Sequence, residues 1–299
     1  MRISLPGWIG ILAFVFFRAF LLPAPLEVSE LAAFPAPLPG AAEKWKLTWS
    51  DEFDGASGSR PDPTKWKFEV GGNGWGNHEL EYYTDRAENA RVEQGKLIIE
   101  ARREDYTGQD GVGRQYTSAR LTTRGSFAQA YGRFAARIKI PRGQGVWPAF
   151  WLLGNDSGKV HWPDCGEIDV MENIGREPAS VHGSMHGPGY SGKLSFTSTY
   201  KLPGGPKFAD DFHEFSVEWE PNVVRFYADE YLYATFVPAQ LPPGEKWVFD
   251  HPFYIILNLA IGGDWPGPPG ETTELPQQML VDYVRVYSQA SQPGVGGHS

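Results

Sequence analysis

The sequence predicts an all-β protein in which two antiparallel sheets pack face to face, most simply as a jelly-roll sandwich. Aromatic residues make up 14% of the 299 residues, and 35 Gly and 25 Pro indicate many turns. From residue 45 to residue 288, short apolar or alternating runs are separated by Gly, Pro, Asn and Asp, as is typical of strands and turns. This region has no helical pattern of three turns or more and no internal repeat, so we expect one domain.

Six segments carry the clearest strand patterns. They are residues 96–104, 132–140, 215–221, 223–229, 252–260 and 281–288. In the second segment, Phe134, Ala136 and Ile138 alternate with charged residues, which predicts one buried and one solvent-exposed face. The third and fourth segments meet at Pro221 and Asn222, so we expect a hairpin there, followed by a strand with the sequence DEYLYATF.

The two ends of the chain are expected to lie outside this domain. Arg2 is followed by an apolar run at residues 9–17, which is typical of an export signal, although the mostly apolar residues 3–24 also suit an uncleaved anchor. We therefore expect a secreted or extracytoplasmic protein, held at a membrane if this segment is retained. The predicted organisation is a signal peptide or anchor at 1–24, a Pro/Ala-rich linker at 25–44, the domain at 45–288 and a flexible tail at 289–299.

Charge and cysteine content exclude several classes of function. The net charge of −9 argues against a nucleic-acid or anionic-membrane partner, but it is compatible with a neutral polymer. The single cysteine, Cys165, rules out an intramolecular disulfide, so export without disulfides is expected. Because no basic partner is visible near it in the sequence, we expect a buried, inert thiol rather than a nucleophile.

Three carboxylates crowd the segment GEIDVMEN at residues 166–173. On a regular strand Glu167 and Asp169 share a face, whereas Glu172, five residues after Glu167, points to the other side. A β-bulge at Val170 and Met171 would add one residue and bring Glu172 back to the face of the other two. The alternatives are a solvated edge strand with scattered acids, or a cation site, although acids strung along an extended strand converge poorly on one ion.

Like charges stacked on one strand face repel each other, so their arrangement suits chemistry better than stability. Hydrolysis of a glycosidic bond with retention of configuration uses two carboxyl groups about 5–5.5 Å apart, one as nucleophile and one as acid/base.

The run EIDVME resembles the active-site signature of glycoside hydrolase family 16, in the bulged form typical of laminarinase-like endo-β-1,3-glucanases and also of agarases and carrageenases. The resemblance extends over residues 45–288 and includes WSDEFDG (49–55), GGNGWGNHELEYYT (71–84), VWPAFWLLG (146–154), WPDCGEIDVMEN (162–173), PFYIILNLAIGGDWPG (252–267) and VDYVRVY (281–287). Two positions bear on subsite details: Glu81 stands where family members often have Gln, and Asp264 precedes Trp265.

The resemblance implies a concave substrate cleft and a retaining double displacement that requires no cofactor. Glu167 matches the nucleophile and Glu172 the acid/base, while Asp169 between them is expected to hydrogen-bond Glu167. Neighbouring anions should raise the pKa of Glu172 and keep it protonated, and the three acids should titrate as a coupled set.

Aromatic residues are the first candidates for sugar binding, because the C–H faces of sugar rings pack on aromatic planes. Trp147 and Trp151 are four residues apart and share a strand face. The resemblance places both beside the cleaved bond, whereas the pattern alone also suits core positions. Trp75 and Trp265 lie in Gly-rich segments and are expected at the cleft rim.

Arg120 and two histidines complete the candidate site. The resemblance implies that Arg120 contacts sugar hydroxyls, the alternative being a surface arginine. His182 and His186 have the spacing of helical zinc ligands, but Gly183 and Gly187 argue against a helix, which disfavours a zinc peptidase. His186 resembles a cleft histidine near the acid/base, the alternative being a structural role.

The resemblance also implies a structural calcium far from catalysis. The matching ligands are Glu52, the backbone of Gly95 and Asp282, a small set that predicts a weak site.

These observations predict a monomeric retaining endo-glycosidase that hydrolyses laminarin-like β-1,3-glucan. Mixed-linkage β-glucan, a galactan and transfer to a sugar acceptor remain alternatives for the same site. A non-catalytic β-glucan-binding module is the alternative from another class, although such modules have lost the acids that are present here.

Overall fold

The computed structural model describes residues 44–271 and 273–290. The predicted signal or anchor, the linker up to residue 43 and the tail from residue 291 lie outside the described residues. Within the described part of the chain, no helix has both the length and the apolar character needed to cross a membrane.

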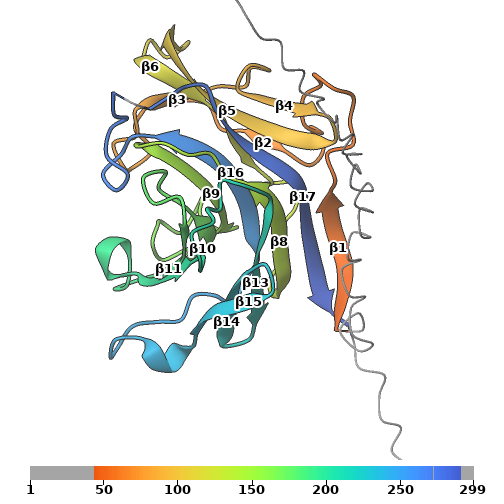
Figure 1. Ribbon diagram of the computed structural model, residues 1–299. Helices are drawn as coiled ribbons and strands as arrows, with labels where there is room; N and C mark the ends of the chain where they lie inside the picture. The colour runs from red at the N-terminus through yellow and green to blue at the C-terminus, as the bar shows by residue number, and fades with distance from the viewer. Residues whose placement is uncertain (1–43, 272, 291–299) are drawn as a thin grey trace, which may run out of the picture. The chain divides into compact units, whose positions relative to one another are not determined.

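The described residues form two sheets that pack against each other (Figure 1). The ten-stranded sheet has the order β15 (Tyr231–Phe236), β14 (Val223–Ala228), β13 (His213–Glu220), β8 (Gly132–Lys139), β17 (Gln277–Gln289), β5 (Lys96–Thr107), β6 (Gly113–Ser118) and β3 (Glu81–Tyr83), with β1 (Trp45–Asp51) paired to β17 and β4 (Ala90–Glu93) to β5. The seven-stranded sheet has the order β12 (Phe196–Lys201), β11 (Ser180–His186), β10 (Glu167–Glu172), β9 (Val146–Gly154), β16 (Phe253–Ile261), β7 (Arg120–Thr122) and β2 (Lys67–Phe68).

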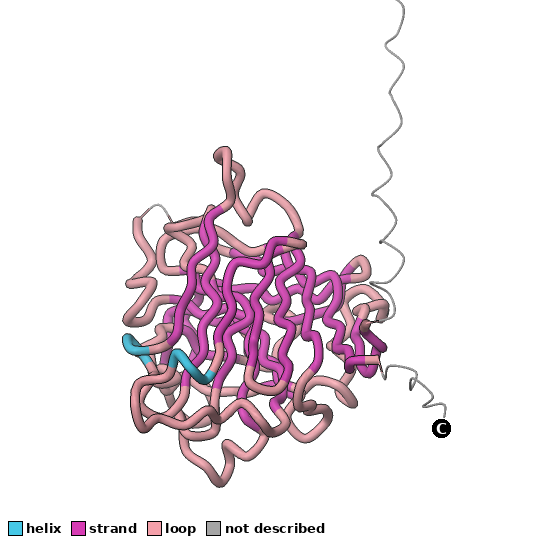
Figure 2. The backbone as a smooth tube through the Cα atoms, turned by 90° about the horizontal axis from the view of Figure 1, so that it is seen from below, coloured by secondary structure: helices cyan, strands magenta, loops and turns pink. Residues whose placement is uncertain are grey.

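Pairing is antiparallel throughout both sheets except between β3 and β6, and two 3-10 turns, η1 (Gly192–Leu194) and η2 (Pro238–Gln240), lie among the loops. Figure 2 shows the strands in magenta, with loops at their ends. The predicted all-β, jelly-roll-like sandwich is confirmed, and each of the six predicted segments is a strand. The hairpin between β13 and β14 turns at Asn222, whose φ of 62° lies in the left-handed region that asparagine tolerates.

Alternating side chains from both sheets fill the space between them. Phe134, Ala136 and Ile138 of β8 are fully buried, as the alternation predicted. Trp219 of β13 is also fully buried, and its indole N–H donates a hydrogen bond to the carbonyl of Phe249 at 3.1 Å. Removing each such side chain from water contributes about 1.5–3 kcal/mol, so this layer supplies most of the free energy that holds the sheets together.

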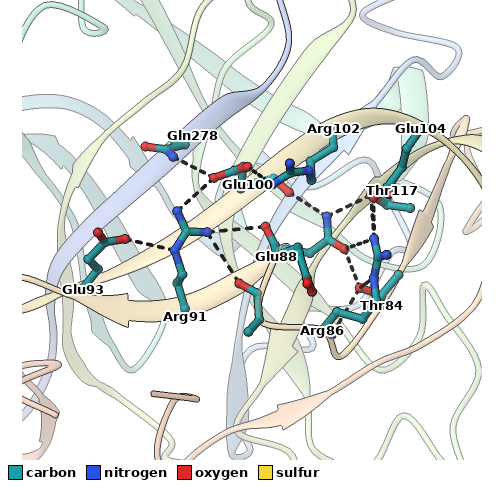
Figure 3. Close-up of polar contacts among 12 residues, drawn as sticks. Thr84, Arg86, Glu88, Arg91, Glu93, Glu100, Arg102, Glu104, Thr117 and Gln278 are labelled. Carbon is teal, nitrogen blue, oxygen red and sulfur yellow. Dashed lines mark hydrogen bonds and ion pairs between the residues drawn. The ribbon is translucent and has the colours of Figure 1, made fainter. Parts of the chain in front are cut away.

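The outward face of the ten-stranded sheet carries a network of ion pairs (Figure 3). Arg91 of β4 lies between Glu93 and Glu100, at 3.0 Å from an oxygen of each. Gln278 of β17 donates a hydrogen bond to Glu100 at 2.7 Å, so the network ties β4, β5 and β17 together. Partly exposed pairs contribute little individually, so the network fixes the alignment of these strands more than it adds stability.

We expect Trp219→Ala to lower the free energy of unfolding by about 3–5 kcal/mol, because it leaves a cavity and an unpaired carbonyl in the core. Urea unfolding followed by circular dichroism measures this loss. Trp219→Phe, which keeps most of the volume, should cost clearly less. A loss below about 1 kcal/mol for the alanine variant would contradict this account of the core.

Candidate active site

The carboxylate strand β10 lies between β9 and β11 and contains the predicted bulge. Asp169 pairs with Trp151 of β9, but the next paired residue is Met171, so Val170 has no partner on either neighbouring strand. On the β11 side, pairing resumes at Glu172, which faces His182.

The extra residue resets the alternation of side chains. Ile168, Val170 and Met171 are all fully buried in the core between the sheets. Glu167 and Glu172 pair with His186 and His182 on β11, which are four residues apart and therefore on one face. The bulge thus brings both glutamates to the same face of the sheet.

Each glutamate accepts a hydrogen bond from a tryptophan. Trp162 donates its indole N–H to Glu167 Oε2 at 3.0 Å, and Trp147 of β9 donates its indole N–H to Glu172 Oε1 at 3.0 Å. An indole is rigid and can only donate, so each bond fixes a carboxylate oxygen without adding charge.

His186 faces the other two acids. Its Nε2 lies 3.0 Å from Asp169 Oδ2 and 3.8 Å from Glu167 Oε1. The backbone N–H of Gly192 donates to His186 Nδ1 at 3.1 Å. A ring nitrogen that accepts a hydrogen bond carries no proton, so in neutral His186 the proton is on Nε2, the nitrogen beside the carboxylates.

A proton on His186 Nε2 disfavours metal binding at that nitrogen. Glu167, Asp169 and His186 bring one ligand atom each within 4.8 Å of one another, a spacing compatible with an ion. A metal would need the lone pair of Nε2, whereas the hydrogen bond from Gly192 places the proton there. The arrangement therefore suits proton sharing among the acids better than metal coordination.

Burial raises the pKa values of all three acids, and the charge of Asp169 adds to the rise for the two glutamates. Burial, followed by the charge of Asp169, raises the pKa of Glu167 to about 8, and burial raises the pKa of Asp169 to about 7. The pKa of Glu172 lies well above its ordinary value, first because of burial and then because of Asp169. The expected rise for Glu172 is present, but burial contributes more than the neighbouring anions that the sequence suggested.

Trp151 and Trp75 enclose Arg120. The guanidinium carbon lies 4.7 Å from the ring centroid of each tryptophan, and Arg120 also pairs with Glu69. The side chain of Arg120 is only 12% exposed, so it is not a free surface arginine. Trp151, Arg120 and Trp75 form what we term the stacked wall of the site.

Trp147 and Trp265 form the other aromatic contact. Their ring centroids lie 5.6 Å apart in an edge-to-face arrangement, and Trp265 also meets the ring of His182 edge-on at 4.9 Å. Trp147 and Trp151 are both half-buried, whereas Phe150 between them is fully buried, so the two tryptophans lie on the site face of β9 rather than in the core.

His182 does not lie on a helix, the setting in which its spacing from His186 would suggest zinc ligands. It lies on strand β11, its Nδ1 lies 2.9 Å from Thr199 Oγ1, and burial lowers its pKa. Cys165 is fully buried, and burial raises the pKa of its thiol to about 11, in agreement with the expected inert cysteine.

The predicted calcium ligands already have cationic partners. Glu52 accepts hydrogen bonds from Arg285 at 3.0 and 2.8 Å, and Asp282 pairs with Arg137 at 2.7 Å. The oxygen donors suit calcium by type, but the two carboxylates would have to leave these arginines to bind it. As placed, the carboxylates of Glu52 and Asp282 do not fit the ion, and the calcium site that would include Gly95 stays a prediction.

Sequence reasoning missed Trp162 and Asn258. Trp162 begins the segment WPDCGEIDVMEN, and an aromatic residue five positions before Glu167 was a usable signal. Asn258 is the one polar residue in the apolar run FYIILNLAI of β16, and its Oδ1 accepts the indole N–H of Trp151 at 2.7 Å. A lone amide in a buried strand is itself a signal, because such a group needs a partner.

The fold and the paired carboxylates define a glycoside hydrolase of the two-carboxylate type. The model of the family described as glycosyl hydrolases family 16 matches residues 75–285, and the chain belongs to this family.

Relatives match nearly the whole domain. A protein named beta-glucanase from Rhodothermus marinus is 47% identical over 277 residues, which cover 90% of this chain and 93% of that protein. The laminarinase catalytic domain from Thermotoga maritima MSB8 superimposes with a TM-score of 0.78 at 52% identity, covering 82% of this chain and 99% of that one. The endo-β-1,3-glucanase from Pyrococcus furiosus gives a TM-score of 0.80 at 48% identity, covering 84% and 97%.

Asp169→Asn should lower the pKa of Glu167 below its value of about 8, because it removes the neighbouring like charge that disfavours ionisation. NMR titration of ¹³C-labelled glutamate carboxyl carbons reports this value. As a control, Asp164→Asn removes an exposed carboxylate close in sequence and should leave the pKa of Glu167 unchanged. An unchanged or higher pKa in Asp169→Asn would contradict the described electrostatics.

Proposed function

We propose that this chain is a retaining endo-β-1,3-glucanase in which Glu167 is the nucleophile and Glu172 the acid/base. The observation that carries the proposal is the bulge at Val170, which places the two glutamates on one face, each held by an indole N–H. Two carboxyls positioned this way are the machinery of double displacement.

In the first step, Glu172 gives its proton to the glycosidic oxygen while the Glu167 carboxylate attacks the anomeric carbon. The bond from that carbon to the leaving oxygen breaks, and an ester between the sugar and Glu167 forms. In the second step, the Glu172 carboxylate takes a proton from water, whose oxygen attacks the anomeric carbon and releases Glu167. Two inversions at one carbon give net retention.

The raised pKa values are compatible with these roles if Glu167 and Asp169 share one proton. With the proton on Asp169, the anion rests on Glu167, where the indole N–H of Trp162 and the nearby His186 stabilise it. Burial, followed by the charge of Asp169, raises the pKa of Glu172 and favours its protonated form. One site thereby holds an ionised nucleophile and a protonated acid.

The surroundings suit a neutral polysaccharide. Trp147 and Trp151 offer aromatic surface on both sides of the bulge, and their rigid rings bind sugar faces at little entropic cost. The net charge of −9 disfavours a highly sulfated chain. The β-1,3 linkage is supported by the laminarinase and endo-β-1,3-glucanase that match nearly their full length to this chain.

We further propose that the enzyme acts outside the cytoplasm as a monomer. The apolar segment near the N-terminus supports the location. The monomeric state stays a prediction.

Glu167→Gln should reduce the release of reducing sugar from laminarin by roughly 10⁴-fold or more, because it removes the nucleophile, while binding of the polysaccharide persists. Reducing-sugar assays and affinity electrophoresis measure the two quantities. The native chain should release a first product with retained configuration, read by ¹H NMR. An inverted anomer would disprove double displacement, and binding without any turnover would indicate a glucan-binding module.

Glu172→Gln should slow hydrolysis of laminarin by about 10²–10⁴-fold, since the leaving sugar then departs without a proton. Formation of the ester from an aryl β-glucoside with a good leaving group needs no such proton and should change little. Burst kinetics of the released phenol separate the two steps. Equal losses on both substrates would contradict the acid/base role.

A further inference from the structure

A second pair of carboxyl groups is buried outside the catalytic strand. Glu79 is 4% exposed and Glu81 is fully buried. Glu81 Oε2 accepts the backbone N–H of Ile261 at 2.6 Å, and Glu79 Oε1 accepts the side-chain amide of Asn77 at 3.2 Å. Burial, together with the charge of Glu79, raises the pKa of Glu81 well above its ordinary value. Burial beside a second carboxyl therefore favours the protonated form of Glu81.

A chain of hydrogen bonds leads from Glu79 to the catalytic strand. The hydroxyl of Tyr83 donates to Glu79 Oε2 at 2.9 Å, and the side-chain amide of Asn258 donates to the Tyr83 oxygen at 3.1 Å. The Oδ1 of Asn258 in turn accepts the indole N–H of Trp151 at 2.7 Å. Trp151 lies directly opposite Asp169 in the pairing of β9 with β10.

The acceptor role of Glu79 sets the direction of every hydrogen bond in this series, since its two oxygens accept from Asn77 and Tyr83. A phenol has one proton, and because Tyr83 donates it to Glu79, the Tyr83 oxygen must accept the hydrogen bond from Asn258. The amide nitrogen of Asn258 therefore faces Tyr83, which leaves its oxygen for Trp151. The three residues between Trp151 and Glu81 are at most 6% exposed, so the bonds form away from water, where such bonds are stronger.

The series of hydrogen bonds ends at Trp151, which belongs to the stacked wall. Trp151 is pressed against Arg120, and Trp75 on the other side of Arg120 also meets the ring of Tyr83 edge-on at 5.4 Å. A rotation of the Trp151 ring would therefore break a buried hydrogen bond and open the stack. The hydrogen-bond chain and the stack together allow one orientation of this ring.

We propose that Glu79 is a positioning residue for substrate binding. By accepting the hydroxyl of Tyr83, Glu79 fixes the direction of the hydrogen bonds through Tyr83 and Asn258, which we term the relay, and so holds Trp151 in the orientation that receives a sugar ring beside Glu167. The inference rests on the proposed glucanase function. It concerns affinity and not chemistry, because none of the relay residues hydrogen-bonds a catalytic carboxylate.

Tyr83→Phe is the sharpest variant, since it removes one oxygen and leaves the ring packing intact. We expect KM for laminari-oligosaccharides to rise roughly fivefold to tenfold, because Asn258 loses its acceptor and Trp151 its fixed partner, with kcat within about twofold of the native value. Tyr82→Phe, the neighbouring tyrosine outside the relay, is the matched control and should leave both constants unchanged. A loss confined to kcat, or an unchanged KM, would overturn the proposal.

A double-variant test decides whether Tyr83 acts through Trp151. In a Trp151→Phe background, which lacks the indole N–H, adding Tyr83→Phe should raise KM no further. If KM of the double variant instead rises by the product of the two single increases, Tyr83 acts by another route and the proposal is overturned.

A spectroscopic readout separates failure of the relay from failure of the glucanase assignment. The indole ¹⁵N–¹H resonance of Trp151 should shift in Tyr83→Phe, and shift less in Glu79→Gln, but stay in place in Tyr82→Phe and in Glu81→Gln, whose amide mimics the protonated acid. This result needs no substrate, so it stands even if the native chain fails to cleave laminarin. An unmoved resonance in both Tyr83→Phe and Glu79→Gln would overturn the relay.

Discussion

Side chains of a β-strand alternate between two faces, so a strand in a sandwich can present acids to a substrate only at every second position. Glu167 and Glu172 are an odd number of residues apart, and on a regular strand one of them would enter the core. The unpaired Val170 removes this conflict, because it adds a residue whose side chain joins the core with Met171. The site, its proton sharing and the neighbouring aromatic residues all depend on this single change of parity.

Burying three acids close together on one sheet face destabilises their ionised forms, and the surrounding groups limit this destabilisation. The hydrogen-bond donors at the two glutamates are neutral: the indole N–H groups of Trp147 and Trp162 contact them, and the imidazole of His186 lies closer to Asp169 than to Glu167. An arginine at these carboxylates would stabilise their ionised forms and lower the pKa of an acid that has to keep its proton. Arg120 is instead paired with Glu69 inside the stacked wall.

The sequence was sufficient for the features that depend on periodicity. Alternation in β8 predicted which residues would be buried, and the odd spacing between Glu167 and Glu172 predicted the bulge, because both follow from strand geometry alone. Partners across the fold could not be predicted in this way. The bonds of Trp162 to Glu167 and of Asn258 to Trp151 depend on the conformation of a loop and on the register of two strands. The same holds for Glu52 and Asp282, whose pairing with arginines follows from which side chains meet on the outward face. For Glu81, the sequence showed only that a glutamate stands where related sequences often have glutamine. Its burial in the fold explains why the neutral, protonated form is favoured there.

The burial of Cys165 has a practical consequence for measuring motion at this site. The sequence contains no other cysteine. Cys165 is shielded from solvent, and burial raises the pKa of its thiol. A thiol introduced at an exposed position, such as that of Leu194 in η1, would therefore react alone with a maleimide dye or spin label. Because η1 includes Gly192, which contacts His186, a probe at this turn would report directly on whether the loop beside the catalytic acids moves when sugar arrives.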